Sequence, residues 1–159
     1  MELEKTLIII KPDGVARGLV GRIISRIEDK GLRIVGMRMK MVSREMAESH
    51  YAEHKDKRFY PMLLDFITSA PVVVMAVAGR DAPAVVRKLV GPTFSRTDEP
   101  GSIRGDFGMS QSFNIIHASD SPESAERELA IFFKDSDYVR SPSRNSLRWN
   151  YDFSEDGAN

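Results

Sequence analysis

Two uninterrupted apolar runs, KTLIIIK at residues 5–11 and PVVVMAVAG at residues 71–79, most constrain what this chain can fold into. Both are rich in β-branched residues, and the first is stopped by the turn-forming residues PDG. Short apolar runs bounded in this way are typical of strands buried inside a domain. The sequence therefore predicts a sheet whose central strands lie in the core.

Segments with helical periodicity alternate with these strands. Leu19, Ile23 and Ile27 recur at helical spacing before a stop at residues 30–31, and a later helix over residues 81–91 is closed by Gly91. The remaining predicted elements are strands over residues 32–42 and 113–117 and helices over residues 43–54, 59–70 and 121–133, the last with Ser121 as N-cap and Pro122 in its first turn. The resulting βαββαβ order predicts the α+β class, as a ferredoxin-like sandwich in which helices cover one face of a four-stranded antiparallel sheet.

Length and composition indicate one globular domain. The chain has 159 residues, of which 42% are hydrophobic and 29% charged. We expect a single domain over residues 1–152 and a frayed tail over residues 153–159, where apolar periodicity is lost. The 23 basic and 23 acidic residues balance, so no overall field favours nucleic acid or an anionic membrane as a partner. With no cysteine, disulfides, thiolate metal sites and cysteine nucleophiles are excluded.

The N-terminal residues MELEK are acidic where a secretory signal needs basic residues. The apolar run that follows is too short to span a bilayer. We therefore expect a cytoplasmic protein with no membrane partner.

His117 ends the apolar run FNIIH and precedes the small polar residues ASDS. In the helix predicted after it, Glu128 shares the sheet-facing stripe with Ala125, Leu129 and Phe132. A carboxylate on a buried face needs a partner, because breaking a buried pair costs roughly 3–5 kcal/mol. His117 is the nearest candidate in the sequence. The alternative is that Glu128 tilts to the helix edge and His117 only ends a strand, and the spacing alone leaves both open.

Three cations stand at the ends of predicted elements: Lys11 after the first strand, Arg87 late in a helix, and Arg104 in a long loop over residues 92–112. Strand ends and long loops are common places for ligand-binding side chains. Each cation alone is more often a solvated surface charge. The segment KPDG is likewise consistent with an ordinary type I turn, with Pro12 and Gly14 at favoured positions.

Several motifs, in order and at compatible spacing, resemble those of nucleoside diphosphate kinases. They are KTLIIIKPDGVARGLVG, HYAEHKDKRF, PVVVMAV, PGSIRGDF and NIIHASDSPESAERE. The similarity runs from Lys5 to RWNYD near the C-terminus, nearly the whole chain, and NIIHxSDS preceded by IRGDF is highly specific. The sequence has no Gly-x-x-x-x-Gly-Lys-Ser/Thr element, so a P-loop is absent.

The resemblance implies ping-pong transfer of the γ-phosphoryl group from a nucleoside triphosphate to a nucleoside diphosphate through a phosphohistidine on His117. An unperturbed imidazole titrates near ~6.5 and is largely a free nucleophile at neutral pH. A covalent intermediate splits the exchange into two similar halves. Glu128 matches the partner of the histidine and would fix its tautomer.

The resemblance also implies the remainder of the site. Lys11, Arg87 and Arg104 match the phosphate-binding cations, and Thr93 matches a donor to a phosphate; such preorganised groups stabilise the charge on the transferring oxygens. Tyr51 and Asn114 match residues at the phosphate and ribose end, and Ser119 matches one beside the histidine. Mg²⁺ would arrive with the nucleotide, held by phosphates and water, so no side chain is predicted as a metal ligand.

Phe59 matches the position that stacks on the base, and Leu63, one turn later, would widen this apolar platform. The alternative places Phe59 in the core, because FYPMLLDF is apolar, although Lys57 and Arg58 precede it. Stacking uses a π-face that every base has. We therefore expect broad base specificity.

Two departures from the family pattern concern Ala118, where glycine is usual, and the loop over residues 92–99, which lacks the usual Asn-Pro after Thr93. The first affects the backbone after the histidine, and the second affects subunit packing. By resemblance we expect a homo-oligomer, a hexamer or tetramer built from dimers.

Two other functions compete with the kinase. A nucleic-acid-binding module on the same fold would need exposed aromatic residues on its strands and a basic face, and the predicted strands show neither. A relative that has lost catalysis would have no need to keep His117, Lys11, Arg104 and Glu128 together.

Overall fold

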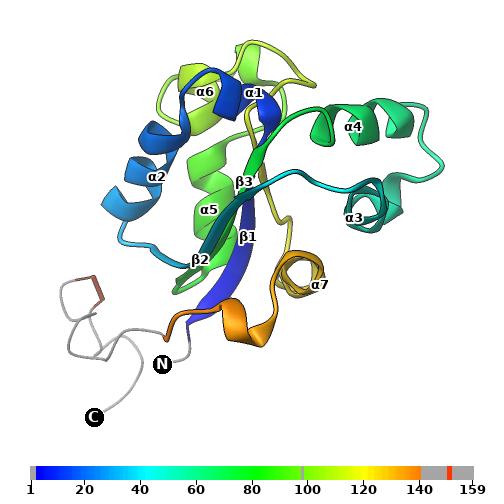
Figure 1. Ribbon diagram of the computed structural model, residues 1–159. Coiled ribbons are helices and arrows are strands. Elements are labelled where there is room, and N and C mark those ends of the chain that lie inside the picture. The colour runs from blue at the N-terminus through cyan, green and yellow to red at the C-terminus, as the bar shows by residue number, and fades with distance from the viewer. Residues whose placement is uncertain (1–2, 98, 141–149, 152–159) are drawn as a thin grey trace.

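A four-stranded antiparallel sheet with strand order β2-β3-β1-β4 forms the centre of the computed structural model, which describes residues 3–97, 99–140 and 150–151 (Figure 1). The strands are β1 (Glu4–Ile10), β2 (Arg33–Lys40), β3 (Val72–Gly79) and β4 (Ile116–Ala118). The two apolar runs are the central strands, paired in register from Glu4 opposite Gly79 to Ile10 opposite Val73. The predicted class and sheet are confirmed, while the tail predicted over residues 153–159 lies outside the described residues.

Helices cover both faces of the sheet, so the prediction of helices on one face is wrong. Helices α2 (Val20–Asp29) and α5 (Ala82–Val90) pack on the face that carries Ile8 and Ile10. Helices α3 (Arg44–His50), α4 (Tyr60–Ile67) and α7 (Pro122–Phe132) pack on the face that carries Leu7 and Ile9, and the two groups lie on opposite sides of the sheet in Figure 1. All eight residues of β3 are buried. A single helical layer would leave one apolar side of β1 and β3 in water, at roughly 1.5–3 kcal/mol for each large side chain.

Local capping explains the helix boundaries. The Ser43 hydroxyl accepts from the Met46 N–H at 3.2 Å at the start of α3, and the Ser121 hydroxyl accepts from the Ser124 N–H at 3.1 Å at the start of α7. Gly91 ends α5 with φ 88°, a conformation that suits glycine. The predicted N-cap of α7 and the predicted stop of α5 are confirmed.

Three local predictions are corrected. The KPDG segment is the beginning of a short helix, α1 (Pro12–Ala16), because proline suits the first helical turn. The predicted loop over residues 92–112 contains η2 (Ser95–Thr97) and α6 (Ile103–Phe107), the latter capped by Ser102, whose hydroxyl accepts from the Gly105 N–H at 2.9 Å. The last strand begins at Ile116 rather than at residue 113, because Ile115 has a left-handed φ of 74°.

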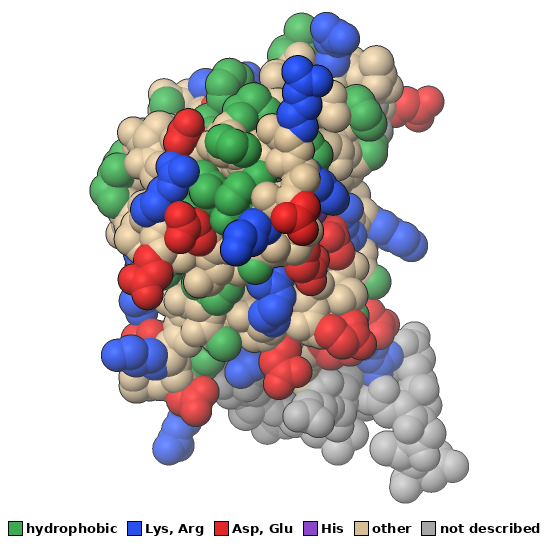
Figure 2. Space-filling view, turned by 90° about the vertical axis from the view of Figure 1, so that its right-hand side faces the viewer, with side chains coloured by type: hydrophobic (Ala, Val, Ile, Leu, Met, Phe, Trp, Pro, Cys, Tyr) green, Lys and Arg blue, Asp and Glu red, His purple; other side chains and the backbone are tan. Residues whose placement is uncertain are grey.

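The surface fits the balanced charge of the sequence. Figure 2 shows acidic and basic side chains interspersed on the face that it presents. Among the described residues, no helix is long and apolar enough to cross a membrane. Two further 3₁₀ turns, η1 (Ala52–His54) and η3 (Asp135–Asp137), complete the described elements.

Candidate active site

His117 lies at the centre of β4 and contacts a buried carboxylate of α7. Its Nε2 is 3.0 Å from Oε2 of Glu128, and the Ser119 hydroxyl donates to the same oxygen at 2.5 Å. Glu128 is 5% exposed and lies on the predicted stripe with Ala125, Leu129 and Phe132. Of the two readings left open by the sequence, the structure supports the buried pair.

The electrostatics of this pair define the histidine tautomer. Burial acts to raise the pKa of the Glu128 carboxyl, but the hydrogen bonds from His117 and Ser119 and the neighbouring imidazoles outweigh it and lower the pKa to about 2. An ionised carboxylate only accepts hydrogen bonds, so the N–H of a neutral His117 is at Nε2. The lone pair of His117 is therefore at Nδ1, the nitrogen that does not face Glu128.

Lys11 lies directly after β1 and is almost fully buried. Its Nζ donates to Oδ1 of Asn114 at 2.7 Å, across 103 positions of sequence. Burial, and next the charge of Arg104, lower the pKa of the Lys11 ammonium to about 8, and nearby Asp13 offsets only part of this effect. A desolvated ammonium between other donors is suited to an anionic ligand.

Arg104 projects from α6 and is 4% exposed. Its guanidinium donates to backbone carbonyls at 2.7 Å (Ile116), 3.1 Å (Gly91) and 3.3 Å (Asn114). These bonds tie the long loop to the ends of α5 and β4. The guanidinium is therefore held rigidly beside the histidine.

Arg87, near the end of α5, and Thr93, just after it, lie in the same cavity as His117. Nη1 of Arg87 is 3.2 Å from Oδ1 of Asp120 and 3.4 Å from the carbonyl of Ala118. Ala118 itself is buried and pairs with Ile8, and it is not among the described residues with positive φ, so the methyl group in place of glycine is accommodated.

The predicted site residues line one cavity of about 530 Å³. They are Lys11, Tyr51, Phe59, Leu63, Arg87, Thr93, Arg104, Asn114, His117 and Glu128. Ser119 is the exception: it is fully buried behind Glu128 and contacts that carboxylate instead of the cavity. The other predicted residues therefore share one cavity, and Ser119 instead supports the Glu128 carboxylate.

The two aromatic residues of the cavity differ in environment. Tyr51 is 7% exposed, and burial raises the pKa of its phenol, so the hydroxyl stays protonated and is available as a donor. Phe59 is 44% exposed, with its ring centroid 5.8 Å from that of His54. The alternative that places Phe59 in the core is therefore wrong, because the side chain is an open face at the mouth of the cavity.

Asp13 and Ile115 are parts of the site that the sequence did not reveal. Oδ2 of Asp13 accepts from the Ile115 N–H at 3.0 Å, and the Lys11 N–H donates to the Ile115 carbonyl at 2.8 Å. These bonds support the left-handed Ile115 and orient the adjacent Asn114 toward Lys11. No sequence motif predicts this contact, because 102 positions separate Asp13 from Ile115.

The carboxylates of the cavity are already paired with basic groups. They are Glu53, Asp120 and Glu128, and each faces a basic group: Arg127 at 3.9 Å, Arg87 at 3.2 Å and His117 at 3.0 Å, respectively. Mg²⁺ prefers six oxygen ligands and keeps several waters. The donor set fits an ion held mainly by nucleotide phosphates, and not a dedicated protein cage.

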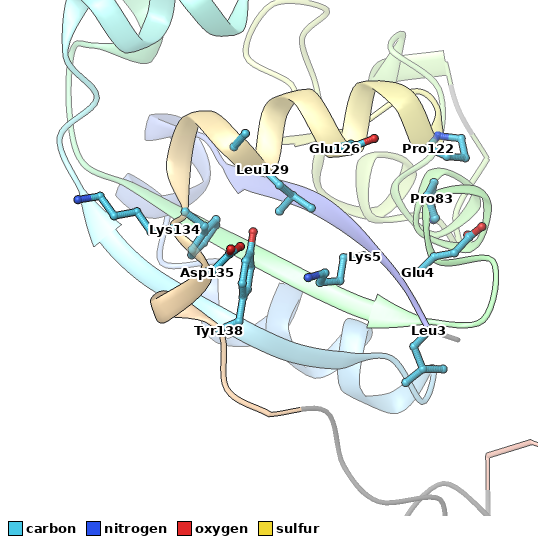
Figure 3. Close-up of a pocket in the computed structure, with 12 residues that line it drawn as sticks. Leu3, Glu4, Lys5, Pro83, Pro122, Glu126, Leu129, Lys134, Asp135 and Tyr138 are labelled. Carbon is cyan, nitrogen blue, oxygen red and sulfur yellow. The ribbon is translucent and has the colours of Figure 1, made fainter. Parts of the chain in front are cut away.

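A second hollow, of about 850 Å³, runs along α7 beside the start of β1 (Figure 3). Its rim carries Glu4, Lys5, Glu126 and Asp135, and no predicted site residue lines it. Its mixed charges favour neither an anionic nor a cationic ligand. The cavity around His117 is therefore the candidate active site.

Comparison with known proteins decides the family. The family model described as nucleoside diphosphate kinase matches residues 4–138. The chain belongs to the nucleoside diphosphate kinase family. It is accordingly an enzyme, a phosphotransferase that acts on nucleotides.

Relatives and solved structures agree with this assignment. The nucleoside diphosphate kinase of Archaeoglobus fulgidus is 56% identical over 137 residues, which cover 86% of this chain and 91% of that one. The enzyme of Thermococcus kodakarensis is 59% identical over 84% of this chain and 78% of its own. The structure of a halophilic nucleoside diphosphate kinase from Halobacterium salinarum in complex with CDP is 44% identical, covers 95% of this chain and all of that chain, and superposes with a TM-score of 0.90.

Proposed function

We propose that the chain moves the γ-phosphoryl group of a nucleoside triphosphate to a nucleoside diphosphate by a ping-pong mechanism, with His117 as the phosphorylated residue. The observation that carries this proposal is the pair of His117 and the buried Glu128 carboxylate, 3.0 Å apart, inside a cavity lined by cations. This pair leaves the lone pair of His117 at Nδ1, and no described residue forms a hydrogen bond with that nitrogen.

In the first half-reaction, Nδ1 of His117 attacks the γ-phosphorus. The N–P bond forms while the bond from phosphorus to the β–γ bridging oxygen breaks, and the nucleoside diphosphate leaves with that electron pair. The imidazole becomes positive, and the Glu128 carboxylate stabilises it through the Nε2–H bond. The second half-reaction reverses these steps with the acceptor diphosphate.

Lys11, Arg87 and Arg104 supply the charge that the transferring oxygens require. The rigid bonds of Arg104 to three carbonyls and of Lys11 to Asn114 mean that little reorganisation accompanies the reaction. We assign Tyr51, Thr93 and Asn114 as neutral donors toward phosphate and ribose oxygens. When bound, Mg²⁺ would neutralise phosphate charge, and the roles of these side chains do not require a direct bond to it.

Phe59 and Leu63 supply a base platform in this proposal. The exposed ring of Phe59 and the half-buried Leu63 offer an apolar face at the cavity mouth. Stacking is tolerant of base identity, so we propose broad specificity for purine and pyrimidine nucleotides. The Halobacterium salinarum relative was solved with CDP, a pyrimidine nucleotide, which supports this reading.

Labelled ATP tests the mechanism. Incubation with [γ-³²P]ATP and Mg²⁺, with no acceptor present, should place an acid-labile label on the protein, and a chase with GDP should remove it as labelled GTP. His117→Ala should take up no label and should still bind ADP, because the cations hold the phosphates. His54→Ala is the matched control, since it removes another imidazole lining the cavity, and it should be labelled normally. Label on His117→Ala at the parental level would refute the proposal.

A homo-oligomer of four or six chains and a cytoplasmic location remain predictions. Light scattering coupled to size-exclusion chromatography measures the first. A stable monomer would show that the loop over residues 92–99, with its exposed Phe94, does not support the assembly expected from the family.

A further inference from the structure

His50 is a buried histidine that the proposed reaction does not use. It ends α3, is 4% exposed, and neither of its ring nitrogens has a hydrogen-bond partner among the described residues. Its ring packs edge-on against that of His117, with centroids 4.5 Å apart and planes at 82°. Buried polar atoms without a partner are rare in proteins and indicate an unaccounted interaction.

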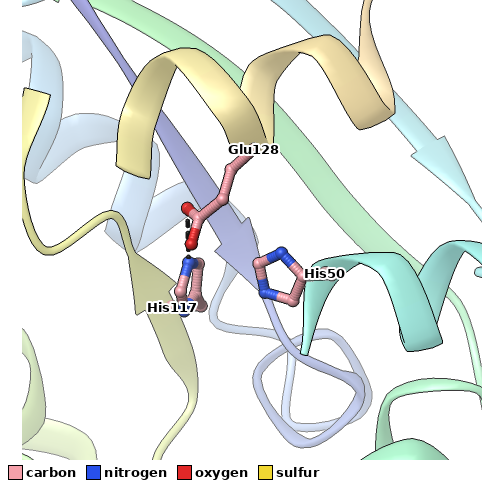
Figure 4. A group of neighbouring side chains, drawn as sticks. All are labelled: His50, His117 and Glu128. Carbon is pink, nitrogen blue, oxygen red and sulfur yellow. Dashed lines mark hydrogen bonds and ion pairs between the residues drawn. The ribbon is translucent and has the colours of Figure 1, made fainter. Parts of the chain in front are cut away.

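His50 converges with His117 and Glu128 on one point. The three side chains come from α3, β4 and α7, and Figure 4 shows them gathered below α7, with Glu128 directed at His117. One potential ligand atom from each lies within 4.8 Å of the others, and Nε2 of His117 and Oε2 of Glu128 are 3.0 Å apart. Within the described ranges, this is the group of three such side chains close enough to share a metal ion.

We propose that His50, His117 and Glu128 form a binding site for Zn²⁺ or a similar borderline transition-metal ion, distinct from the Mg²⁺ that accompanies the nucleotide. Two imidazoles and one carboxylate, with a fourth position open to water, are a donor set that zinc accepts in tetrahedral sites. Mg²⁺ prefers oxygen ligands and octahedral geometry, so the same set disfavours it.

The geometry needs only a small adjustment to close around an ion. Tetrahedral bonds of ~2.1 Å place ligand atoms about 3.4 Å apart, close to the 3.0 Å between His117 and Glu128. The remaining separations are at most 4.8 Å, and the His50 ring can adjust them by turning about its Cβ–Cγ bond, a torsion with a broad energy minimum. No hydrogen bond to a described residue has to break at His50.

The ion would act as an inhibitor by changing the tautomer of His117. Zinc needs the lone pair of the nitrogen that faces Glu128, which is Nε2. A neutral imidazole bound through Nε2 carries its proton on Nδ1, so no proton is lost and the two nitrogens exchange roles. The nitrogen required for attack on phosphorus then has no lone pair. This consequence rests on the proposed phosphohistidine mechanism, whereas the metal site itself does not.

Zinc binding to the full-length, nucleotide-free protein tests the site. Calorimetric titration with ZnCl₂ should give one ion per chain for the parent and for His54→Phe. His50→Phe keeps an aromatic ring, slightly larger than imidazole, and removes both nitrogens. Its zinc affinity should therefore fall at least tenfold, since even outer-shell changes cost ~10–100-fold. The three histidines of the chain are His50, His54 and His117, so His117→Ala completes the set and should also lose the site. No binding by the parent, or equal binding by His50→Phe, would overturn the proposal.

Two further measurements keep the proposal testable if His50→Phe does not fold. His50→Gln is a smaller polar replacement, for which the same loss of zinc affinity is expected.

In the parent, long-range ¹H–¹⁵N spectra should show the His117 proton at Nε2 without zinc and at Nδ1 with one equivalent of zinc. A proton that stays at Nε2 would overturn the site. Zinc should also suppress labelling of the parent by [γ-³²P]ATP, and EDTA should restore the labelling. In His50→Phe the same suppression should require ~10-fold more zinc. Absence of labelling before zinc is added would refute the kinase mechanism and leave the binding results to decide the metal site.

Discussion

Raising the pH through 8 should weaken nucleotide binding by removing the proton of Lys11. The ammonium is 7% exposed, donates to Asn114 at 2.7 Å, and has its pKa lowered to about 8 by burial and then by Arg104. A phosphate bound beside it favours the charged form and so raises the pKa again. Binding of ADP is therefore coupled to proton uptake by this side chain.

The size of the effect follows from the pKa of about 8. In the nucleotide-free protein, Lys11 is about 90% protonated at pH 7, about 50% at pH 8 and about 10% at pH 9. Binding at pH 8 should take up about 0.5 proton per chain, and the apparent Kd for ADP should rise about tenfold between pH 7 and pH 9. Because Lys11 binds the phosphate only when it is charged, the affinity for ADP is highest below the pKa of Lys11 and falls as the pH rises above it.

Calorimetry in two buffers of different ionisation enthalpy measures this uptake. Work above pH 7.5 avoids the terminal phosphate of ADP, which titrates near ~6. Lys11→Arg is the matched control, because a guanidinium stays charged across this range, and its uptake should be near zero. A parent protein that takes up no proton at pH 8 and binds ADP equally well just above pH 7.5 and at pH 9 would refute the reasoning.

Three further substitutions probe the site. Glu128→Gln should lower turnover with little change in apparent affinity, because it keeps an acceptor for His117 and loses the charge; unchanged turnover would make Glu128 a structural residue only. The lowered pKa of the Glu128 carboxyl stabilises the folded parent above pH 4.5, and this contribution fades as the pH falls toward 2. Glu128→Gln lacks this contribution. Urea unfolding should therefore show a smaller difference in stability between parent and variant at pH 2 than at pH 5. Arg104→Ala should lower turnover by ~10²–10³, measured at saturating nucleotide; a change confined to KM would make it a uniform binder. Phe59→Ala should weaken ADP, GDP, CDP, UDP and dTDP alike, by ~1–3 kcal/mol in kcat/KM, and a loss restricted to one base would contradict stacking.

The sequence predicts those parts of the candidate site that depend on the type of a residue and on its position within one strand or helix. His117 and Glu128 could be paired because one ends a strand and the other lies on the buried stripe of the next helix, eleven positions away. The cations were visible only as charges at element ends until the family motifs assigned them roles. Ser119 was placed beside the histidine by resemblance, and its contact with Glu128 explains why a hydroxyl belongs there.

Other features depend on partners that local patterns do not connect. The left-handed Ile115 shortens β4, and it is supported by Asp13 from 102 positions away. In the sequence, nothing sets His50 apart within the predicted helix over residues 43–54. In the structure its ring lies against His117, and no described residue forms a hydrogen bond with it. Periodicity reports which side of a segment is apolar, and it does not report which distant segment comes to cover that side.

The sequence by itself determined the two central strands, the order of the four strands along the chain, the start of α7 and the end of α5. Runs such as TLIII and VVVMAV, the cap Ser121 and the stop Gly91 act through local sterics and short-range hydrogen bonds. Only the tertiary structure decided that helices cover both faces of the sheet and that Lys11 meets Asn114 and Arg104 at one end of it. The physical reason is that burial and charge depend on neighbours brought together by packing. The same ammonium that would be a solvated lysine in an extended chain becomes, beside a buried arginine, a desolvated cation suited to a phosphate.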